Sequence, residues 1–258
     1  MIEVKNVWKS FDGKVVIQDV SATMQPGKTN LIIGTSGSGK TVLMKLTIGL
    51  VPVDKGEVFY EGKDITKMGE KELKEVRKQI GMLFQGGALF DSKDVEKNVM
   101  FPLDMFTKMS EAEKMRRVNE VLERVNLKDA NRKFPSEISG GMKKRVALAR
   151  AIVLNPKYLF CDEPNSGLDP QTSLVIDKLI KEITLEYNIT SIINTHDMNT
   201  VMESGDHIIY IYQGKKQWEG SNKEIIFSKD ERLNSFIFAS EFLTKAKEMS
   251  MMEAQGRK

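Results

Sequence analysis

The chain has 258 residues, enough for one large or two modest domains with a sizeable core, which excludes peptide hormones and small disulfide-held scaffolds. Lysine and arginine total 39 against 36 aspartate and glutamate residues, and this near balance gives no reason to expect a nucleic-acid partner. One cysteine, Cys161, and two histidines exclude an internal disulfide, a cysteine-built metal site and a histidine cage, as expected in a reducing compartment.

The sequence contains no stretch typical of a membrane span or of a secretion signal. No apolar run approaches the roughly 18 to 20 residues needed to cross a bilayer. Charged residues interrupt the opening segment, residues 1–14, so a signal-peptide core is absent there. We therefore expect a cytoplasmic protein.

The N-terminal part of the chain favours short strands separated by glycine-containing turns. We predict strands at residues 2–7, 15–24, 29–33, 57–60 and 79–84. Between the third and fourth strands, apolar residues at helical spacing predict a helix over residues 39–50 that ends before Pro52. The strand at 29–33, the loop after it and the helix at 39–50 are therefore predicted to follow one another directly.

Helices and strands alternate through the remainder of the chain. Residues 86–156 are polar and helix-forming, and Ser110 begins a helix whose apolar residues share one face, which predicts a helical insert. Strands are predicted at 158–162, 190–194 and 207–213, with an amphipathic helix at 174–187. This alternation predicts an α/β fold with a mainly parallel sheet. From residue 231 we expect a helix followed by disorder.

A glycine-rich loop between a predicted strand and helix carries a phosphate-binding pattern. Its glycines let successive backbone N–H groups point at phosphate oxygens, and the following helix presents its positive end to the same charge. Lys40 would reach the β and γ phosphates of a nucleotide, and the Thr41 hydroxyl would bind Mg²⁺. The pattern G-x-x-x-x-G-K-[ST] is formed by Gly34, Thr35, Ser36, Gly37, Ser38, Gly39, Lys40 and Thr41, which we call the P-loop.

Two acids end the predicted strand at 158–162. Asp162 can hold Mg²⁺ through the water shell that this cation retains. Glu163 can orient and deprotonate a water that attacks the γ phosphate. Acids at a strand end are commonly structural, and the P-loop is what favours the catalytic interpretation here. Cys161 in the same strand fits a small core residue better than a nucleophile.

A second glycine pair begins another predicted helix, over residues 143–154. Ser139 is a natural N-cap, and Gly140 and Gly141 follow it. The basic cluster 143–145 opposes the helix dipole, and an anion bound at this helix terminus would explain both the glycines and the charges. The alternative is an ordinary capped helix with a solvated basic face.

With these three motifs in this order, the chain resembles the ATPase subunit of an ABC transporter from Ile2 to about Lys229. The family usually has Leu-Ser-Gly-Gly-Gln where this chain has residues 138–142, Ile-Ser-Gly-Gly-Met, so it departs at both ends of the motif. The resemblance implies a P-loop core with a mainly parallel sheet, an N-terminal antiparallel β-subdomain and an inserted helical subdomain. It also implies one domain over residues 1–230, with the insert at about 86–156, and a C-terminal helix and disordered tail over 231–258.

The resemblance adds four residues to the predicted site. It implies that Phe11 stacks on adenine, although tyrosine is commoner there. It implies that Gln85 meets Mg²⁺ and the attacking water, and that His196 hydrogen-bonds the γ phosphate. Asp169 lies in residues 166–169, which resemble the loop at the dimer contact, with glycine where alanine is usual. His207 lies outside every motif and is predicted to be structural.

The resemblance further implies two copies of the chain that sandwich two ATP molecules, with Ser139, Gly140 and Gly141 of one copy facing the γ phosphate held by Lys40 of the other. Integral-membrane permease subunits are the implied partners, and the chain is expected on the inner face of the plasma membrane. Residues 87–90 are a candidate permease contact, or they pack inside the helical insert. The C-terminal helix could dock on its own subunit or on its twin.

Three stretches resemble the lipid-transport branch of the family, which includes the Mla phospholipid systems of Gram-negative envelopes and works with MCE-domain proteins. They are residues 84–92, 101–103 and 142–145. Importers of polar solutes share the same core motifs, so cargo stays open between lipid and polar solute. Two other classes of protein fit the sequence less well. A small-molecule P-loop kinase would give Ser139 to Gly141 no role. A soluble ABC factor that acts on ribosomes or DNA would usually carry two cassettes or a long coiled coil, and this sequence shows neither.

Overall fold

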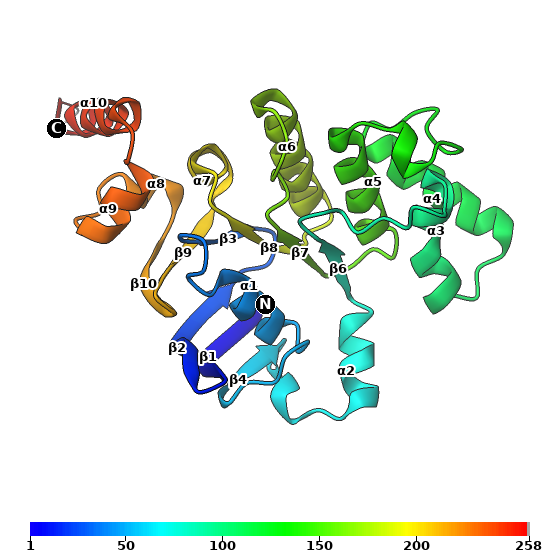
Figure 1. Cartoon of the computed structure of the whole chain (residues 1–258), viewed down its shortest axis with the longest axis horizontal. Helices are drawn as coiled ribbons and strands as arrows, with labels where there is room; N and C mark the ends of the chain where they lie inside the picture. Colours follow the sequence, from blue (N-terminus) through cyan, green and yellow to red (C-terminus); the bar gives the residue numbers. More distant parts are fainter. Residues whose placement is uncertain (257–258) are drawn as a thin grey trace. The chain divides into compact units, whose positions relative to one another are not determined.

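The computed structural model describes residues 1–256 and divides them into two compact units. The P-loop unit consists of residues 2–24, 29–66 and the chain from 195 onward. The signature unit consists of Met1, residues 25–28 and residues 67–194. The two units are described separately below, and Figure 1 labels their elements.

The P-loop unit contains a four-stranded antiparallel sheet in the order β2-β1-β4-β5. Its long β1–β2 hairpin turns at Asp12 and Gly13, as the sequence predicts. Alternate residues such as Ile2, Val4 and Val58 are buried, which is the period-2 pattern of a sheet with one covered face. The strands are β1 (Ile2–Phe11), β2 (Lys14–Met24), β4 (Lys55–Tyr60) and β5 (Lys63–Asp64), followed by the 3₁₀ turn η1 (Ile65–Lys67).

A second group of strands in this unit positions the P-loop. The strand β3 (Thr29–Ile33) pairs in parallel with β9 (His207–Tyr212), which pairs antiparallel with β10 (Lys215–Gly220). Every residue of β3 is buried, and the chain passes from it through the P-loop into α1. The helices that accompany these strands are α1 (Lys40–Thr47), α7 (Met198–Ser204) and α8 (Asn222–Ile225).

The C-terminal helices α9 (Glu231–Ile237) and α10 (Glu241–Gly256) belong to the P-loop unit. Phe236 stacks on Tyr210 of β9 with ring centroids 5.3 Å apart, so α9 docks on its own chain. Lys247 of α10 donates to the Asn234 side chain of α9 at 2.5 Å. Helix α10 continues through the methionine-rich segment where the sequence favours disorder; residues 257 and 258 lie outside the described residues.

In the signature unit, the strands are all parallel and stand in the order β8-β7-β6. They are β6 (Ile80–Leu83), β7 (Tyr158–Asp162) and β8 (Thr190–Thr195), whose last residue falls in the P-loop unit. Residues 158–161 of β7 are completely buried or nearly so, as the continuous apolar run predicts. Helix α6 (Pro170–Glu186) runs between β7 and β8 in the chain.

The remaining helices of this unit pack mainly against one another. Helices α3 (Val95–Phe106), α4 (Glu111–Arg124) and α5 (Gly140–Ile152) contact each other pairwise, as Figure 1 shows. Ser110 and Glu113 cap the start of α4 reciprocally, with Ser110 N donating to Glu113 at 2.7 Å. The short elements are α2 (Glu70–Arg77) and the 3₁₀ turn η2 (Pro135–Glu137).

The predicted strand at 29–33 and the predicted strand at 158–162 are confirmed to the residue. The predicted helix at 174–187 begins earlier, because Asp169 and Pro170 form a cap and first turn that the apolar pattern does not reveal. The predicted fold class, with an antiparallel β-subdomain and a mainly parallel sheet, is confirmed. Within residues 1–256, none of the helices has the length and apolar character that a membrane span requires.

Candidate functional site

The P-loop wraps tightly against β9 and its own helix. Gly34 has a φ of +151°, and a Cβ there would lie 2.3 Å from the Ile211 carbonyl oxygen and 2.7 Å from Ser38 Oγ. Only glycine fits this position without moving the backbone. The tip residues Thr35, Ser36 and Gly37 are exposed, whereas Ser38, Gly39 and Lys40 are buried. The loop therefore presents its tip to solvent on a rigid base.

Two side chains inside the P-loop are suited to an anion. Lys40 is 5% exposed, and its Nζ donates to the carbonyl oxygens of Gly34 at 2.9 Å and Thr35 at 3.0 Å. The buried Ser38 hydroxyl has no hydrogen-bond partner within residues 1–256. A bound phosphate would give this hydroxyl an acceptor and the Lys40 ammonium a counter-charge. Thr41 is exposed at the start of α1.

Two further predicted residues lie in the P-loop unit. Phe11, which is 42% exposed, ends β1, and the ammonium of Lys9 lies 5.3 Å from its ring centroid. An exposed aromatic face is what adenine stacking requires. His196 is exposed directly after β8 and precedes Asp197, the N-cap of α7. His207 is buried and hydrogen-bonds Asn30 at 3.1 Å and Glu219 at 2.9 Å, a structural arrangement.

The signature unit carries the acids at the end of β7. Asp162 accepts a hydrogen bond from Asn194 Nδ2 at 3.0 Å, and Glu163 N donates to the Asn194 carbonyl at 2.9 Å. Glu163 has a φ of +46°, a conformation that a non-glycine residue adopts rarely and that is often found at functional sites. Cys161 is fully buried beside these acids, and burial raises the pKa of its thiol.

Gln85 reaches this acid pair from the end of β6. Its Nε2 donates to Glu163 Oε2 and to Ser166 Oγ, each at 3.3 Å. The structure thus brings together Gln85 and Glu163, which are 78 residues apart in the chain. Sequence reasoning missed Ser166 as a hydrogen-bonding member of this group and Asn194 as the support of Asp162. The position of Asn194 directly after the buried apolar pair Ile192 and Ile193 of β8 is the signal that could have indicated it.

The predicted second glycine pair packs against the loop at 166–169. Ser139 is exposed and caps α5 by accepting from Met142 N at 3.3 Å. A Cβ on Gly141 would lie 2.5 Å from Thr172 Cγ2 of α6, so this glycine permits close helix packing. Asp169 caps α6 by accepting from Thr172 N at 3.0 Å, and hydrogen bonds from Thr172 lower the pKa of Asp169.

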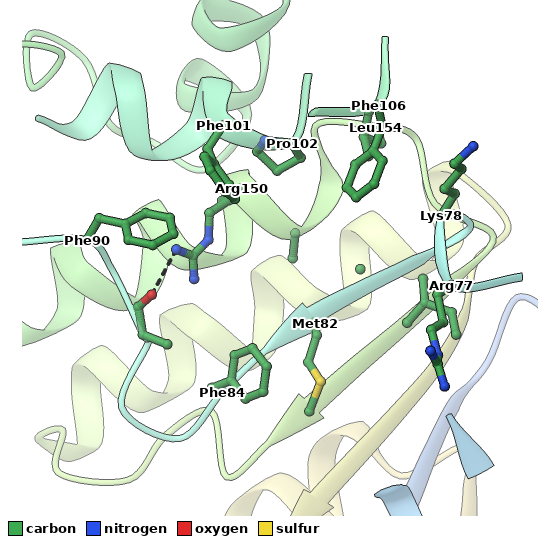
Figure 2. A pocket seen from close by; sticks show the side chains of 14 residues that line it. Arg77, Lys78, Met82, Phe84, Phe90, Phe101, Pro102, Phe106, Arg150 and Leu154 are labelled. Atoms are coloured by element: carbon green, nitrogen blue, oxygen red, sulfur yellow. Dashed lines mark hydrogen bonds between the residues drawn. The ribbon is translucent and has the colours of Figure 1, made fainter. Parts of the chain in front are cut away.

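A pocket of about 290 Å³ opens between β6, α3 and α5 in the signature unit. Figure 2 shows Phe90, Phe101, Pro102 and Phe106 on the α3 side and Met82 and Phe84 on the β6 side. Arg77 and Lys78 also line it. Sequence reasoning had singled out residues 87–90 and 101–103, and the structure places Ala88, Phe90, Phe101 and Pro102 in the lining.

The donor groups suit ATP and Mg²⁺. The glycine cradle and the unpartnered Ser38 hydroxyl fit a phosphate. The Thr41 hydroxyl, the Gln85 side-chain carbonyl and the Asp162 carboxylate are hard oxygen donors, the type that Mg²⁺ prefers. No group of three or more His, Cys, Asp or Glu side chains that could hold a metal occurs in the described part of the chain.

Curated relatives share this chain's sequence over most of its length. It is 40% identical over 230 residues to the probable ribonucleotide transport ATP-binding protein mkl of Mycobacterium leprae, covering 89% of this chain and 66% of that protein. It is 40% identical over 237 residues to the intermembrane phospholipid transport system ATP-binding protein MlaF of Haemophilus influenzae, covering 92% and 90%. The methionine import ATP-binding protein MetN of Carboxydothermus hydrogenoformans is 44% identical, covering 85% and 66%. The chain spans 64 to 66% of the length of the mycobacterial relatives.

Solved structures show the same fold. A dimeric ATP-binding cassette in a post-hydrolysis state, bound to ADP and Pi, superposes with a TM-score of 0.78 at 30% identity, covering 86% of this chain and 99% of that one. The structure of cbiO1 from Clostridium perfringens, part of the ABC transporter complex cbiONQ, superposes with a TM-score of 0.83 at 29% identity, covering 97% and 98%. The sequence profile described as ABC transporter matches residues 17–166, more than half of the chain. The chain therefore belongs to the ABC transporter family.

Proposed function

We propose that this chain, working as a homodimer on the cytoplasmic face of the plasma membrane, hydrolyses ATP to power an ABC transporter of phospholipid or another lipid. The observation that carries the proposal is the P-loop, in which Lys40 is buried against two backbone carbonyls and Ser38 offers an unsatisfied hydroxyl. We assign the ATPase domain to residues 1–230, with a helical subdomain at about 86–156, and a separate C-terminal segment to residues 231–258, in which α9 and α10 extend to Gly256.

The residues of one chain divide the chemistry between binding and hydrolysis. Phe11 stacks on adenine, residues 34–39 surround the phosphates, and Lys40 neutralises their charge. Thr41 and Gln85 would offer oxygen atoms to Mg²⁺, and Asp162 would hold the ion through its water shell, so that the ion would neutralise charge on the phosphates. Glu163 accepts the proton of the attacking water, and His196 donates to the γ phosphate. Asp169 orders the loop that lies at the dimer contact.

A complete site requires a second copy of the chain. Ser139 and Gly140 are exposed at the N-terminus of α5, where a hydroxyl, free backbone N–H groups and the helix dipole all favour an anion. Within one chain, Gly140 and Gly141 lie against Leu168 and Thr172, beside the loop proposed for the dimer contact. The dimeric cassette with ADP and Pi supports a two-chain arrangement.

Mixing two inactive variants tests the two-chain site directly. Lys40→Met removes the P-loop ammonium, and Ser139→Tyr blocks the surface that meets the partner's nucleotide. Each variant alone should lose ATP hydrolysis. A mixed dimer contains one site with both Lys40 and Ser139 intact, so mixing should restore activity in proportion to the mixed-dimer fraction. Absence of restoration in dimers shown by chromatography to be mixed would contradict the proposal, as would full activity of Ser139→Tyr alone.

We propose that the pocket beside β6 binds a cytosolic helix of the permease. Its aromatic lining forms an apolar cavity, and the positive charges of Arg77 and Lys78 favour an acidic residue on that permease helix. Phe106 is 41% exposed in the pocket, and Phe134 is 43% exposed outside it. Phe106→Asp should abolish copurification with the membrane subunits from detergent-solubilised membranes, whereas the matched Phe134→Asp should not. Equal retention by both variants would exclude this surface as the permease contact.

Lipid is the cargo that we propose, with an MCE-domain lipid-binding protein as an additional partner. The match to the phospholipid-transport relative covers 90% of that protein, whereas the matches to the methionine importers cover 66 to 77% of theirs. The alternatives are a polar-solute importer and a small-molecule kinase. Affinity purification from solubilised membranes, followed by mass spectrometry of partner proteins and bound lipid, distinguishes these three functions. A copurified solute-binding protein would contradict the proposal of lipid transport. Phosphoryl transfer to an acceptor other than water would also contradict it.

A further inference from the structure

The loop that follows Gln85 is held by two cationic side chains of α5. This loop, residues 85–90, carries Gln85 at one end and the pocket residue Phe90 at the other. Its backbone bonds include Gly87 N to Phe84 O and Lys93 N to Phe90 O, and the Asn98 side chain accepts from Phe90 N at 2.8 Å and donates to Phe90 O at 3.1 Å. Its conformation therefore depends on outside contacts.

Lys144 supplies one of these contacts at the Gln85 end. Its side chain is 6% exposed, and Nζ donates to the Gln85 carbonyl oxygen. Burial lowers the pKa of Lys144. A buried ammonium on a backbone carbonyl is costly to leave unpaired, so it fixes the position of that carbonyl.

Arg150 supplies the other contact two turns further along α5. Its guanidinium donates from Nη2 to Gly87 O at 2.8 Å and from Nη1 to Ala88 O at 2.9 Å, and it lies 5.9 Å from the Phe90 ring centroid. Figure 2 shows Arg150 pointing from α5 into the pocket with its bond to Ala88. Gly87 has a φ of +74°, and a Cβ there would lie 3.7 Å from Ala147 Cβ, so the loop rests directly on α5 between the two cations.

We propose that Lys144 and Arg150 are positioning residues that clamp the Gln85 loop to α5. Because α5 begins at Ser139, this clamp connects the helix terminus proposed to meet the partner's nucleotide with the side chain proposed to contact the attacking water. Arg150 extends the same connection to the pocket proposed for the permease. The inference rests on the proposed roles of Gln85 and Ser139, and it assigns to Lys144 and Arg150 the task of keeping Gln85 aligned with Glu163.

A double-mutant cycle tests the clamp. Lys144→Met keeps the length of the side chain and removes its donor. It should lower kcat for ATP between about 10-fold and 100-fold, the effect of misplacing a reacting group by about 1 Å, and leave the ATP dissociation constant unchanged. Lys144→Arg should recover part of the loss. In the Gln85→Ala background, Lys144→Met should lower kcat no further, because the residue that it positions is already absent.

Arg117→Met is the matched control. Arg117 of α4 also donates to backbone carbonyls in the signature unit, those of Val153 at 3.0 Å and Ile152 at 3.2 Å, which lie outside the Gln85 loop. Arg117→Met should lower thermal stability as Lys144→Met does, with kcat unchanged. Full additivity of Lys144→Met with Gln85→Ala, or an equal loss of kcat in Arg117→Met, would overturn the proposal.

Amide hydrogen exchange separates the clamp from the role of Gln85. Lys144→Met and Arg150→Met should each speed exchange at residues 85–90, and Arg117→Met should not. If Gln85→Ala hydrolyses ATP at the normal rate, the proposed function of Gln85 is wrong, and the exchange data still decide whether the clamp exists. If exchange at residues 85–90 is unchanged in both clamp variants, the clamp itself is wrong.

Discussion

The two units differ in how firmly their functional side chains are held. In the P-loop unit, Lys40 is buried on two carbonyls at 2.9 and 3.0 Å, and backbone atoms shape the loop around it. In the signature unit, Gln85 is exposed and meets Glu163 and Ser166 through bonds of 3.3 Å. The first site is preorganised by backbone, and the second depends on side chains that can move.

This difference matches two tasks with different demands. Phosphate binding gains from a rigid cradle, because a cradle that is already formed loses little entropy when the ligand arrives. A hydrolytic group that responds to a partner chain must instead have more than one arrangement of comparable energy. Changes in the P-loop unit should therefore alter ATP affinity, and changes in the signature unit should alter turnover. Each prediction below tests that division.

The largest expected effect is on turnover, from Glu163→Gln in the signature unit. Loss of the general base should lower kcat between about 100-fold and 10,000-fold. ATP affinity should stay unchanged, so nucleotide-bound dimers should accumulate on size-exclusion chromatography. Glu123→Gln, which neutralises an exposed acid paired with Lys128, is the control and should hydrolyse ATP normally. Mutant dimers that turn over at the normal rate would contradict the assignment of Glu163.

The next effect is on affinity, from Lys40→Met in the P-loop unit. A charge-assisted bond to phosphate contributes about 1.5 to 3 kcal/mol, so the ATP dissociation constant should rise between about 10-fold and 150-fold, measured by titration calorimetry. Lys45→Met removes an exposed lysine from the same helix and should leave affinity within about twofold. A Lys40→Met chain that binds ATP normally but fails to hydrolyse it would break the division between the two units.

The two units also differ in how much of their functional sites could be predicted from the sequence. The P-loop is contiguous, so its residues, its strand and its helix are all visible in residues 29–50. The acids at 162 and 163 are visible because they end an apolar run. The bonds from Gln85 to Ser166 and from Arg150 to Ala88 join residues 81 and 62 positions apart, and no local pattern encodes them. The cap at Asp169 was likewise hidden, because its partner Thr172 shows no periodic signal.

A smaller effect, on stability, is expected from Gly141→Ala in the signature unit. The added Cβ would lie 2.5 Å from Thr172 Cγ2, an overlap that should lower the free energy of unfolding by about 1 to 3 kcal/mol. Thr172→Ser removes that methyl group and should restore part of the loss. Gly140→Ala is the control, since its nearest atom, Leu168 Cδ2, would lie 3.6 Å away. Urea denaturation of the four chains measures the difference, and equal stabilities for the two alanine variants would show that α5 and α6 do not pack this closely.

The smallest effect concerns the acid stability of the P-loop unit. Hydrogen bonds from His207 and Lys216 lower the pKa of Glu219 to about 2, from an ordinary value of 4.5. Because the folded pKa is depressed, this stabilisation is fully present above pH 4.5 and is lost as the pH falls toward 2. A partly exposed ion pair contributes about 1 kcal/mol, so Glu219→Gln should lower stability by that amount at pH 7 and flatten the decline below pH 4.5. If the free energy of unfolding of Glu219→Gln fell with pH as that of the unchanged chain does, the Glu219 charge would not stabilise the P-loop unit. The rigidity of this unit would then come from its backbone alone.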